Sequence, residues 1–150
     1  MIKLYKTAIR SREDAHALIA LAAKELCGAE DATVLRTAAG KPYFADLPIR
    51  FSLSHSGEMA ILAVSDKEIG ADIEEQLREV DTRLAERFFT AREAAYVAGD
   101  RDRFFEVWTK KEAYGKWNGD GLAATMHTDV LDLDFYTECD GDYRISVYEK

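Results

Sequence analysis

The hydrophobic positions of the first 30 residues predict a strand followed by a helix. Ile2 and Leu4 alternate with polar residues, which is typical of a short strand over about residues 2–9. Apolar residues then recur at helical spacing, at Ala15, Leu18, Ile19, Ala22 and Leu26. Ser11 is a suitable N-cap and Gly28 a suitable residue to end the helix in the left-handed conformation. We therefore expect a helix from about Arg12 to Cys27.

The next segment reads as short strands joined by tight links. Residues 33–37 are a strand candidate, and Gly40-Lys41-Pro42 is a turn. Residues 50–54 and 59–65 are two further strands, joined by His55-Ser56-Gly57-Glu58, and residues 69–74 form a third after Asp66-Lys67-Glu68. Because these links are short, the pattern predicts an antiparallel meander of three strands.

The second half is helical first and extended afterwards. Residues 81–88 form a short helix, and the capping box Thr90-x-x-Glu93 opens another that ends near Gly99. A third helix runs from about Arg101 to Trp117, and two strands follow at about 130–135 and 143–148. The fold class is therefore α+β, a single domain over residues 1–150 with half-domains of about 1–75 and 76–150.

One strand candidate, Ile69-Gly70-Ala71-Asp72-Ile73-Glu74, has an apolar face and an anionic face. Residues two apart on a strand point the same way, so Asp72 and Glu74 share one face while Ile69, Ala71 and Ile73 share the other. Taken alone, this alternation is what an ordinary half-buried surface strand shows.

Composition excludes several classes of function. A chain of 150 residues, 47% hydrophobic, can build the core of one domain, and no apolar run reaches the ~20 residues that cross a bilayer. The N-terminus lacks the apolar core of a signal peptide, so we expect a cytoplasmic protein without a membrane partner. The net charge of −8 argues against nucleic acid as a partner. Cys27 and Cys139 show neither zinc-ligand spacing nor a disulfide framework.

The other candidate residues also have ordinary explanations when each is taken alone. Glu112 and Lys116 lie four apart on one helix face, as many surface ion pairs do. The segment Ser54-His55-Ser56-Gly57 suits phosphate binding but equally a polar hairpin loop. Ser54 and His55 make a poor catalytic pair, because adjacent strand residues point apart and no orienting acid is evident.

Taken together, five motifs carry a specific resemblance over about residues 12–122. They are Gly40-Lys41-Pro42, the stretch 51–57, the stretch 69–74, Phe88-Phe89-(x)3-Glu93, and Trp108-(x)2-Lys111-Glu112-Ala113-(x)2-Lys116-(x)2-Gly119-Asp120-Gly121-Leu122. In this order and spacing they resemble the 4′-phosphopantetheinyl transferases, in particular the larger pseudo-dimeric class that activates carrier proteins of nonribosomal peptide and polyketide synthesis. The resemblance implies two similar half-domains related by a pseudo-twofold axis.

The resemblance also implies an activity and its cofactor. Members of this family transfer the 4′-phosphopantetheine arm of coenzyme A to a serine of an apo acyl or peptidyl carrier protein and release adenosine 3′,5′-bisphosphate. This is a phosphoryl transfer, in which positioning and neutralisation of the pyrophosphate charge supply most of the catalysis. Mg²⁺, which prefers oxygen ligands, is the implied metal.

Residue by residue, the resemblance implies a site. Asp72, Glu74 and Glu112 match the metal-binding carboxylates, and Glu112 is also a candidate base for the incoming serine. Lys116 matches a lysine that contacts the pyrophosphate. The remaining matches concern coenzyme A: Lys41 and Pro42 at the adenine, and Ser54 and His55 at a phosphate.

The sequence departs from the family at one point, and two other functions remain open. Ala17 stands where family members carry a basic residue for the 3′-phosphate, so Arg10, Arg12 or Lys6 is the candidate substitute, and Arg12 is the one we select. A noncatalytic module that binds coenzyme A or a carrier protein is the main alternative, although such a module needs neither the base nor the full metal set. A structural acidic domain is the other. Because both halves lie in one chain, we expect a monomer.

Overall fold

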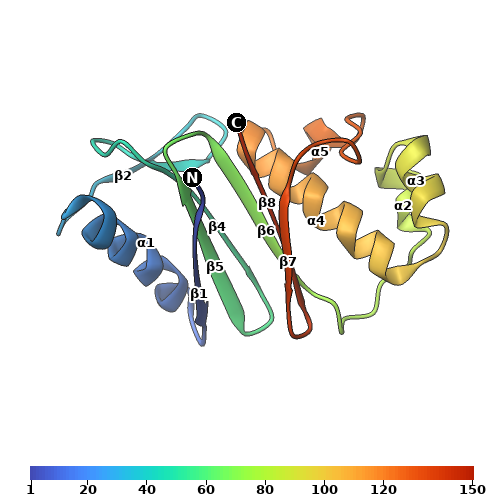
Figure 1. Ribbon diagram of the computed structural model, residues 1–150, viewed down its shortest axis with the longest axis horizontal. Helices are drawn as coiled ribbons and strands as arrows, with labels where there is room; N and C mark the ends of the chain where they lie inside the picture. The colour runs from blue at the N-terminus through green and yellow to red at the C-terminus, as the bar shows by residue number, and fades with distance from the viewer.

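The computed structural model describes residues 1–150 as four layers, with one helix, two three-stranded sheets and a group of helices (Figure 1). Seven elements form the first part of the chain: β1 (Lys3–Ala8), α1 (Arg12–Cys27), β2 (Val34–Arg36), β3 (Pro42–Phe44), β4 (Arg50–Ser56), β5 (Met59–Ser65) and β6 (Ile69–Glu75). Six follow: α2 (Leu84–Phe88), α3 (Ala91–Val97), α4 (Arg101–Asn118), α5 (Leu122–Thr125), β7 (Tyr136–Asp140) and β8 (Tyr143–Glu149). The mixture of helix and strand confirms the α+β class.

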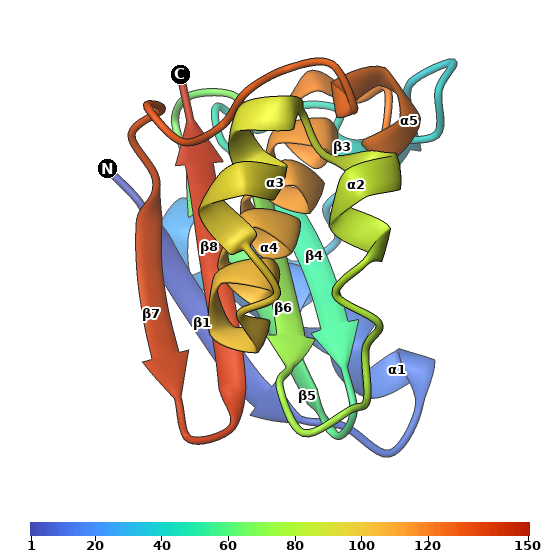
Figure 2. The same ribbon diagram turned by 90° about the vertical axis from the view of Figure 1, so that its right-hand side faces the viewer.

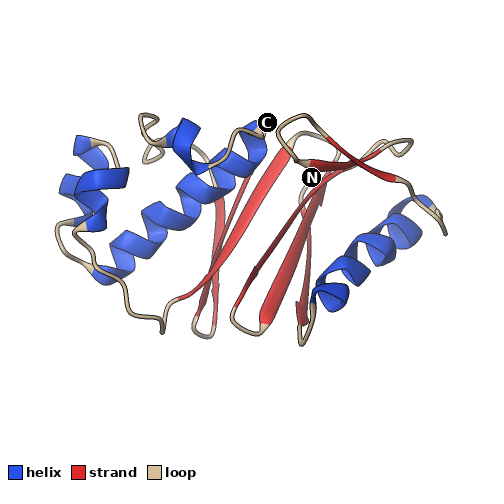
Figure 3. Cartoon of the chain, turned by 180° about the vertical axis from the view of Figure 1, so that it is seen from behind, coloured by secondary structure: helices blue, strands red, loops and turns tan.

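The first sheet has the order β1-β5-β4, and α1 covers its outer face (Figure 3). The helix has the predicted bounds, with Ser11 as its N-cap and Gly28 in the left-handed conformation at φ 67°. Its buried residues pack on Phe51, Leu62 and Val64 of the sheet. The predicted hairpin of β4 and β5 is confirmed as an antiparallel pair.

β6 does not continue this sheet, so the predicted three-stranded meander is wrong. β5 is paired with β1 on one side and β4 on the other, which leaves it no free edge for a further strand. β6 pairs instead with β8, in a second antiparallel sheet of order β6-β8-β7. Its apolar face fills the space between the two sheets, where Ile73 packs with Ile61 of β5 and Ile145 of β8.

The two sheets meet at β4 and β6 through side chains rather than through a backbone ladder. The outer edge of β6 presents backbone N–H groups, and three serine hydroxyls of β4 accept their hydrogen bonds. The pairs are Ala71 N to Ser52 Oγ at 3.0 Å, Ile73 N to Ser54 Oγ at 3.3 Å and Glu75 N to Ser56 Oγ at 2.9 Å. We call these three serines the serine seam. It satisfies an edge that would otherwise be unpaired.

The outer face of the second sheet is covered by α4, with α2 and α3 packed on the far side of that helix (Figure 2). α4 approaches β6 at Gly70, where an added Cβ atom would lie 2.0 Å from the carbonyl oxygen of Ala113 and 2.2 Å from the nitrogen of Trp117. No side chain fits there, so glycine sets the closeness of strand and helix.

The predicted strand at 130–135 is wrong, because this segment is an irregular connection and the strand β7 begins at Tyr136. Val130, Leu133 and Phe135 pack as a loop against the helices α2–α4. Their apolar spacing therefore reflects packing on helices rather than a ladder.

The remaining elements largely follow the sequence. The capping box of α3 forms as expected, with Thr90 Oγ1 accepting from Glu93 N at 3.1 Å and Glu93 Oε1 accepting from Thr90 N at 2.9 Å. β3 and the short α5 were not foreseen. Cys27 and Cys139 are free. None of the helices is both long enough and apolar enough to cross a membrane.

Candidate active site

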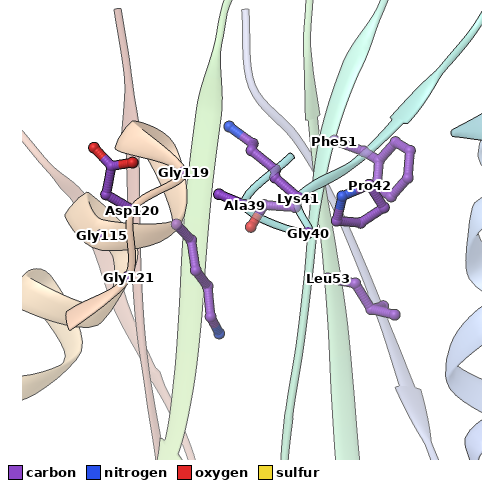
Figure 4. A pocket seen from close by; sticks show the side chains of 12 residues that line it. Ala39, Gly40, Lys41, Pro42, Phe51, Leu53, Gly115, Gly119, Asp120 and Gly121 are labelled. Carbon is purple, nitrogen blue, oxygen red and sulfur yellow. The ribbon is translucent and has the colours of Figure 1, made fainter. Parts of the chain in front are cut away.

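A cavity of about 330 Å³ opens between β3 and β4 on one side and the C-terminal end of α4 on the other. On one side it is lined by the turn Gly40-Lys41-Pro42 and by Phe51 and Leu53, and on the other by Gly119-Asp120-Gly121 (Figure 4). Gly115 and Lys116 of α4 and Ser52 of β4 complete the wall. The cavity is therefore built from both parts of the chain.

Asp72 lies at the centre of the polar contacts. β6 directs its side chain toward α4, and the residue is only 4% exposed. Its Oδ1 atom accepts hydrogen bonds from Lys116 Nζ at 3.0 Å and from Ser54 Oγ at 3.1 Å. Lys116 Nζ also donates to Ser54 Oγ at 3.0 Å. The Oδ2 atom of Asp72 is buried without any hydrogen-bond partner, which is a costly state for a carboxylate oxygen.

Glu74, two residues further along β6, has both carboxylate oxygens engaged. Oε1 accepts from the indole nitrogen of Trp108 at 3.1 Å, and Oε2 forms a salt bridge with Arg78 at 3.0 Å. Burial raises the pKa of Glu74, and the negative charge of Asp72 adds to the effect, while Arg78 opposes it.

Glu112 lies one helical turn before Lys116 on α4 and is half-buried. Burial raises the pKa of its carboxyl from 4.5 to about 7, and the charges of Asp72 and Glu74 contribute in the same direction. Lys116 opposes this shift but does not cancel it. A carboxyl with a pKa near 7 suits proton transfer at neutral pH.

The three carboxylates interact electrostatically, yet no three His, Cys, Asp or Glu side chains are gathered closely enough to hold a metal ion as they stand. The donor types fit Mg²⁺, which takes carboxylate oxygens together with water and substrate phosphates. The unpartnered oxygen of Asp72 also fits, because it faces no competing donor. The other oxygens of Asp72 and Glu74 are engaged, since Lys116 holds Oδ1 of Asp72, and Trp108 and Arg78 hold the two oxygens of Glu74.

Lys41 and Pro42 line the cavity as expected, but the ammonium group of Lys41 is already engaged. Its Nζ atom lies 3.0 Å from Glu68 Oε2, 3.2 Å from the carbonyl of Ile69 and 3.0 Å from the carbonyl of Trp117. The lysine thus ties the turn to β6 and to the end of α4. Backbone atoms of the turn and the ring of Pro42 are what it offers to a ligand.

His55 and Arg12 are not brought into the cavity. Both are exposed, His55 near the end of β4 and Arg12 at the start of α1. His55 pairs with Ala60 of β5. Ala8, at the end of β1, pairs with the neighbouring residue Met59, and Arg12 begins the helix that follows β1. His55 and Arg12 therefore belong to the same end of the first sheet. The predicted site residues therefore separate into a central group around Asp72 and a peripheral group.

Several residues that shape the site were missed as individuals. Arg78 follows β6 in a connector that shows no motif, so nothing in the sequence pointed to it. Gly70 could have been found, because it lies two residues before Asp72 and therefore on the same strand face. Lys111 forms a fully buried ion pair with Glu93 at 2.7 Å and also donates to the carbonyl of Thr128 at 2.9 Å. This pair fixes α4, which carries the next residue, Glu112.

Comparison with known proteins agrees with the resemblance. A sequence profile described as the 4'-phosphopantetheinyl transferase superfamily matches residues 68–150. The protein named 4'-phosphopantetheinyl transferase gsp, from Aneurinibacillus migulanus, is 37% identical over 98 residues, which cover 62% of this chain and 40% of that protein. The 4'-phosphopantetheinyl transferase Sfp of Bacillus subtilis (strain 168) is 38% identical over 93 residues, covering 58% and 41%. AcpT of Salmonella typhi is 40% identical over 89 residues, covering 53% and 46%.

This chain therefore spans less than half the length of these curated relatives in the matched regions. The matched profile covers more than half of the chain and includes β6, with Asp72 and Glu74, and α4, with Glu112 and Lys116. The chain belongs to the 4'-phosphopantetheinyl transferase superfamily.

Proposed function

We propose that this protein transfers the 4′-phosphopantetheine arm of coenzyme A to a serine of an apo acyl or peptidyl carrier protein and releases adenosine 3′,5′-bisphosphate. The relatives carry the name of this activity. The observation that carries the proposal is the cluster of Asp72, Lys116 and Glu112 beside one cavity, where a buried acid, a basic side chain and a carboxyl with a raised pKa meet.

The proposed reaction assigns a proton acceptor to Glu112. The serine oxygen forms a bond to the phosphorus that carries the pantetheine arm, and the bond from that phosphorus to the bridging oxygen breaks. The bridging oxygen leaves with adenosine 3′,5′-bisphosphate, and the serine proton passes to the Glu112 carboxylate, directly or through water. The pKa of about 7 supports this role, because such a carboxylate is basic enough to accept the proton at neutral pH.

Mg²⁺ dependence is part of the proposal. Asp72, Glu74 and Glu112 would hold the ion, which when bound would neutralise charge on the pyrophosphate. Asp72 has the best-supported role, because its Oδ2 atom is buried and unpartnered. Glu74 must first release Arg78 or bind through water, since both of its oxygens are engaged.

Coenzyme A would occupy the cavity between the turn Gly40-Lys41-Pro42 and the segment Gly119-Asp120-Gly121. Lys116 lines this cavity and would contact the pyrophosphate, with Ser54 beside it. His55 and Arg12 remain proposed phosphate contacts at the edge of the site. Their exposure leaves them free to meet a ligand that extends out of the cavity.

We further propose that the two sheets with their helices are half-domains related by a pseudo-twofold axis. The expected bounds of about 1–75 and 76–150 need one correction, because β6 (Ile69–Glu75) pairs with β8 in the second sheet, which supports a boundary between β5 and β6. Each half-domain has a three-stranded antiparallel sheet with one long helix on its outer face, which supports this reading. Because the cavity draws residues from both, we propose that a monomer completes its own site. The proposed setting is the cytoplasm, in carrier-protein activation for nonribosomal peptide or polyketide synthesis.

Covalent labelling of a carrier protein tests the function. The protein is incubated with a fluorescent coenzyme A conjugate, Mg²⁺ and a panel of apo carrier proteins, and labelled carrier is detected by gel and by mass spectrometry of the serine peptide. Labelling is the expected result. Binding of coenzyme A without labelling of any carrier at high protein concentration would instead favour the noncatalytic binding module.

The role of Glu112 is tested by Glu112→Gln. Loss of a general base lowers turnover by roughly 10²–10⁴-fold, while the affinity for coenzyme A should change little. The matched control is Glu30→Gln, the same chemical change at an exposed surface pair with Lys24. An equal loss of turnover and of affinity would argue against the base role.

A further inference from the structure

Lys116 holds the position at Asp72 that a cation is expected to take. The Asp72 carboxylate is almost fully buried, and the only positive charge in contact with it is the Lys116 ammonium, 3.0 Å from Oδ1. A buried carboxylate without a counter-charge is strongly destabilising, so this contact makes the ligand-free arrangement tenable. The ammonium group does here what a bound cation would do.

The other two carboxylates do not complete a metal site with Asp72 as they stand. Glu74 is engaged by Trp108 and Arg78. Glu112 lies one helical turn before Lys116 on α4 and is half-buried. The three carboxylates fit a metal by type and yet form no metal cluster as they stand.

The Lys116 side chain also has space in the cavity into which it can turn. This side chain lines the cavity and is 34% exposed, whereas that of Asp72 is 6% exposed, so the lysine can turn toward the cavity while the aspartate stays in place. Leaving Asp72 costs the ammonium a charge-assisted hydrogen bond. An anionic group in the cavity would replace that bond, and the pyrophosphate of coenzyme A is such a group.

We propose that Lys116 is a displaceable cation, which occupies Asp72 in the ligand-free protein and exchanges for a divalent metal ion when coenzyme A provides a new anionic partner. The inference rests on the proposed function and extends it. It implies that metal and coenzyme A bind with positive coupling, because each removes an obstacle to the other. Binding linkage is reciprocal, so the factor by which coenzyme A tightens metal binding equals the factor by which metal tightens coenzyme A binding.

The test measures metal affinity and not turnover. Free Mn²⁺, used in place of Mg²⁺, is titrated by electron paramagnetic resonance against the full chain at fixed pH, with and without saturating coenzyme A, and Mn²⁺ bound to coenzyme A alone is subtracted. We expect coenzyme A to tighten Mn²⁺ binding to the wild-type protein by at least about tenfold, the effect of one charge-assisted hydrogen bond.

The neutral variants Lys116→Gln and Lys116→Met should bind Mn²⁺ about tenfold more tightly than wild type without coenzyme A, and coenzyme A should then add little. Two variants are used because the apolar one leaves Asp72 with fewer partners, and circular dichroism checks that each is folded. The control is Lys110→Gln, which removes the same charge from the same helix at a residue paired with Glu106 and not with Asp72. It should change Mn²⁺ affinity by less than about threefold, as expected of a screened, distant charge.

Two results would overturn the exchange. One is equal Mn²⁺ affinity of the wild-type protein with and without coenzyme A. The other is a folded Lys116→Gln protein that binds Mn²⁺ no more tightly than the Lys110→Gln control. If either result occurs while carrier proteins are still labelled, the exchange fails and the proposed function stands. If coenzyme A does not bind at all, the proposed function fails as well.

Discussion

Glu112→Gln should stabilise the ligand-free protein at alkaline pH, although it should abolish most of the proposed activity. The native environment of Glu112 disfavours the ionised carboxylate, because the group is half-buried beside the charges of Asp72 and Glu74. Glutamine keeps the size and polarity of the side chain but carries no charge. The substitution therefore removes an unfavourable electrostatic interaction from the folded state.

The magnitude follows from the pKa. A rise from 4.5 to about 7 corresponds to about 3 kcal/mol at 1.36 kcal/mol per pKa unit. Because the side chain is only half-buried, solvent screening reduces this to about 1–2 kcal/mol. Below pH 4.5 the carboxyl is protonated in both the folded and the unfolded state, so Glu112 costs nothing. Between pH 4.5 and about 7 the unfolded carboxyl ionises while the native one keeps its proton, so the free energy of unfolding falls as the pH rises, and above pH 7 the loss is complete.

Urea unfolding in EDTA at pH 5 and pH 8 measures the difference. At pH 8 the Glu112→Gln protein should unfold with a free energy about 1–2 kcal/mol higher than wild type, and at pH 5 the two should differ by less than about 0.5 kcal/mol. Glu79→Gln, the same change at an exposed residue of the β6–α2 connection, should show no such pH dependence. A stability difference of the same size at both pH values would refute the electrostatic reasoning.

Three other substitutions test the frame around the site, each by urea unfolding of the ligand-free protein. Gly70→Ala should lower the free energy of unfolding by about 1–3 kcal/mol or more, because the added Cβ atom collides with the backbone of α4. Lys111→Met should cost about 3–5 kcal/mol by leaving Glu93 buried and unpaired, and the double variant with Glu93→Gln should recover part of that loss. Ser52→Ala leaves the backbone N–H of Ala71 without its acceptor and should lower the free energy of unfolding by about 1–3 kcal/mol. An unchanged urea midpoint would show that this hydrogen bond of the serine seam does not contribute to stability.

The elements that could be predicted best were those with local signals. Helix α1 has its apolar spacing, its N-cap and its terminal glycine within one short segment, and its bounds were predicted correctly. The capping box of α3 is equally local. By contrast, the apolar residues at 130–135 resembled a strand because they alternate, and only their contacts with distant helices show that they are a loop.

The partner of β6 could not be predicted, because strand pairing depends on which edges are free in three dimensions. The sequence placed Ser52 and Ser54 on a strand and Ser56 in the link after it, and it did not show that a second strand lies against all three serines. In the same way, the resemblance assigned Asp72 and Lys116 to separate ligands. It carried no information on what these two side chains contact when the ligands are absent.

The polar side chains of the site lower the stability of the folded protein, so the surrounding contacts must hold them in place. Asp72 has a buried oxygen without a partner, and the carboxyl of Glu112 is hard to ionise. The close contact of Gly70 with the backbone of α4 and the buried ion pair of Lys111 with Glu93 fix the position of α4. The serine seam fixes the second sheet to the first. Because Ser54 belongs to the seam and also donates to Asp72, the joint between the sheets is itself part of the site. A change that loosens the joint should therefore disturb the polar cluster before it unfolds either sheet.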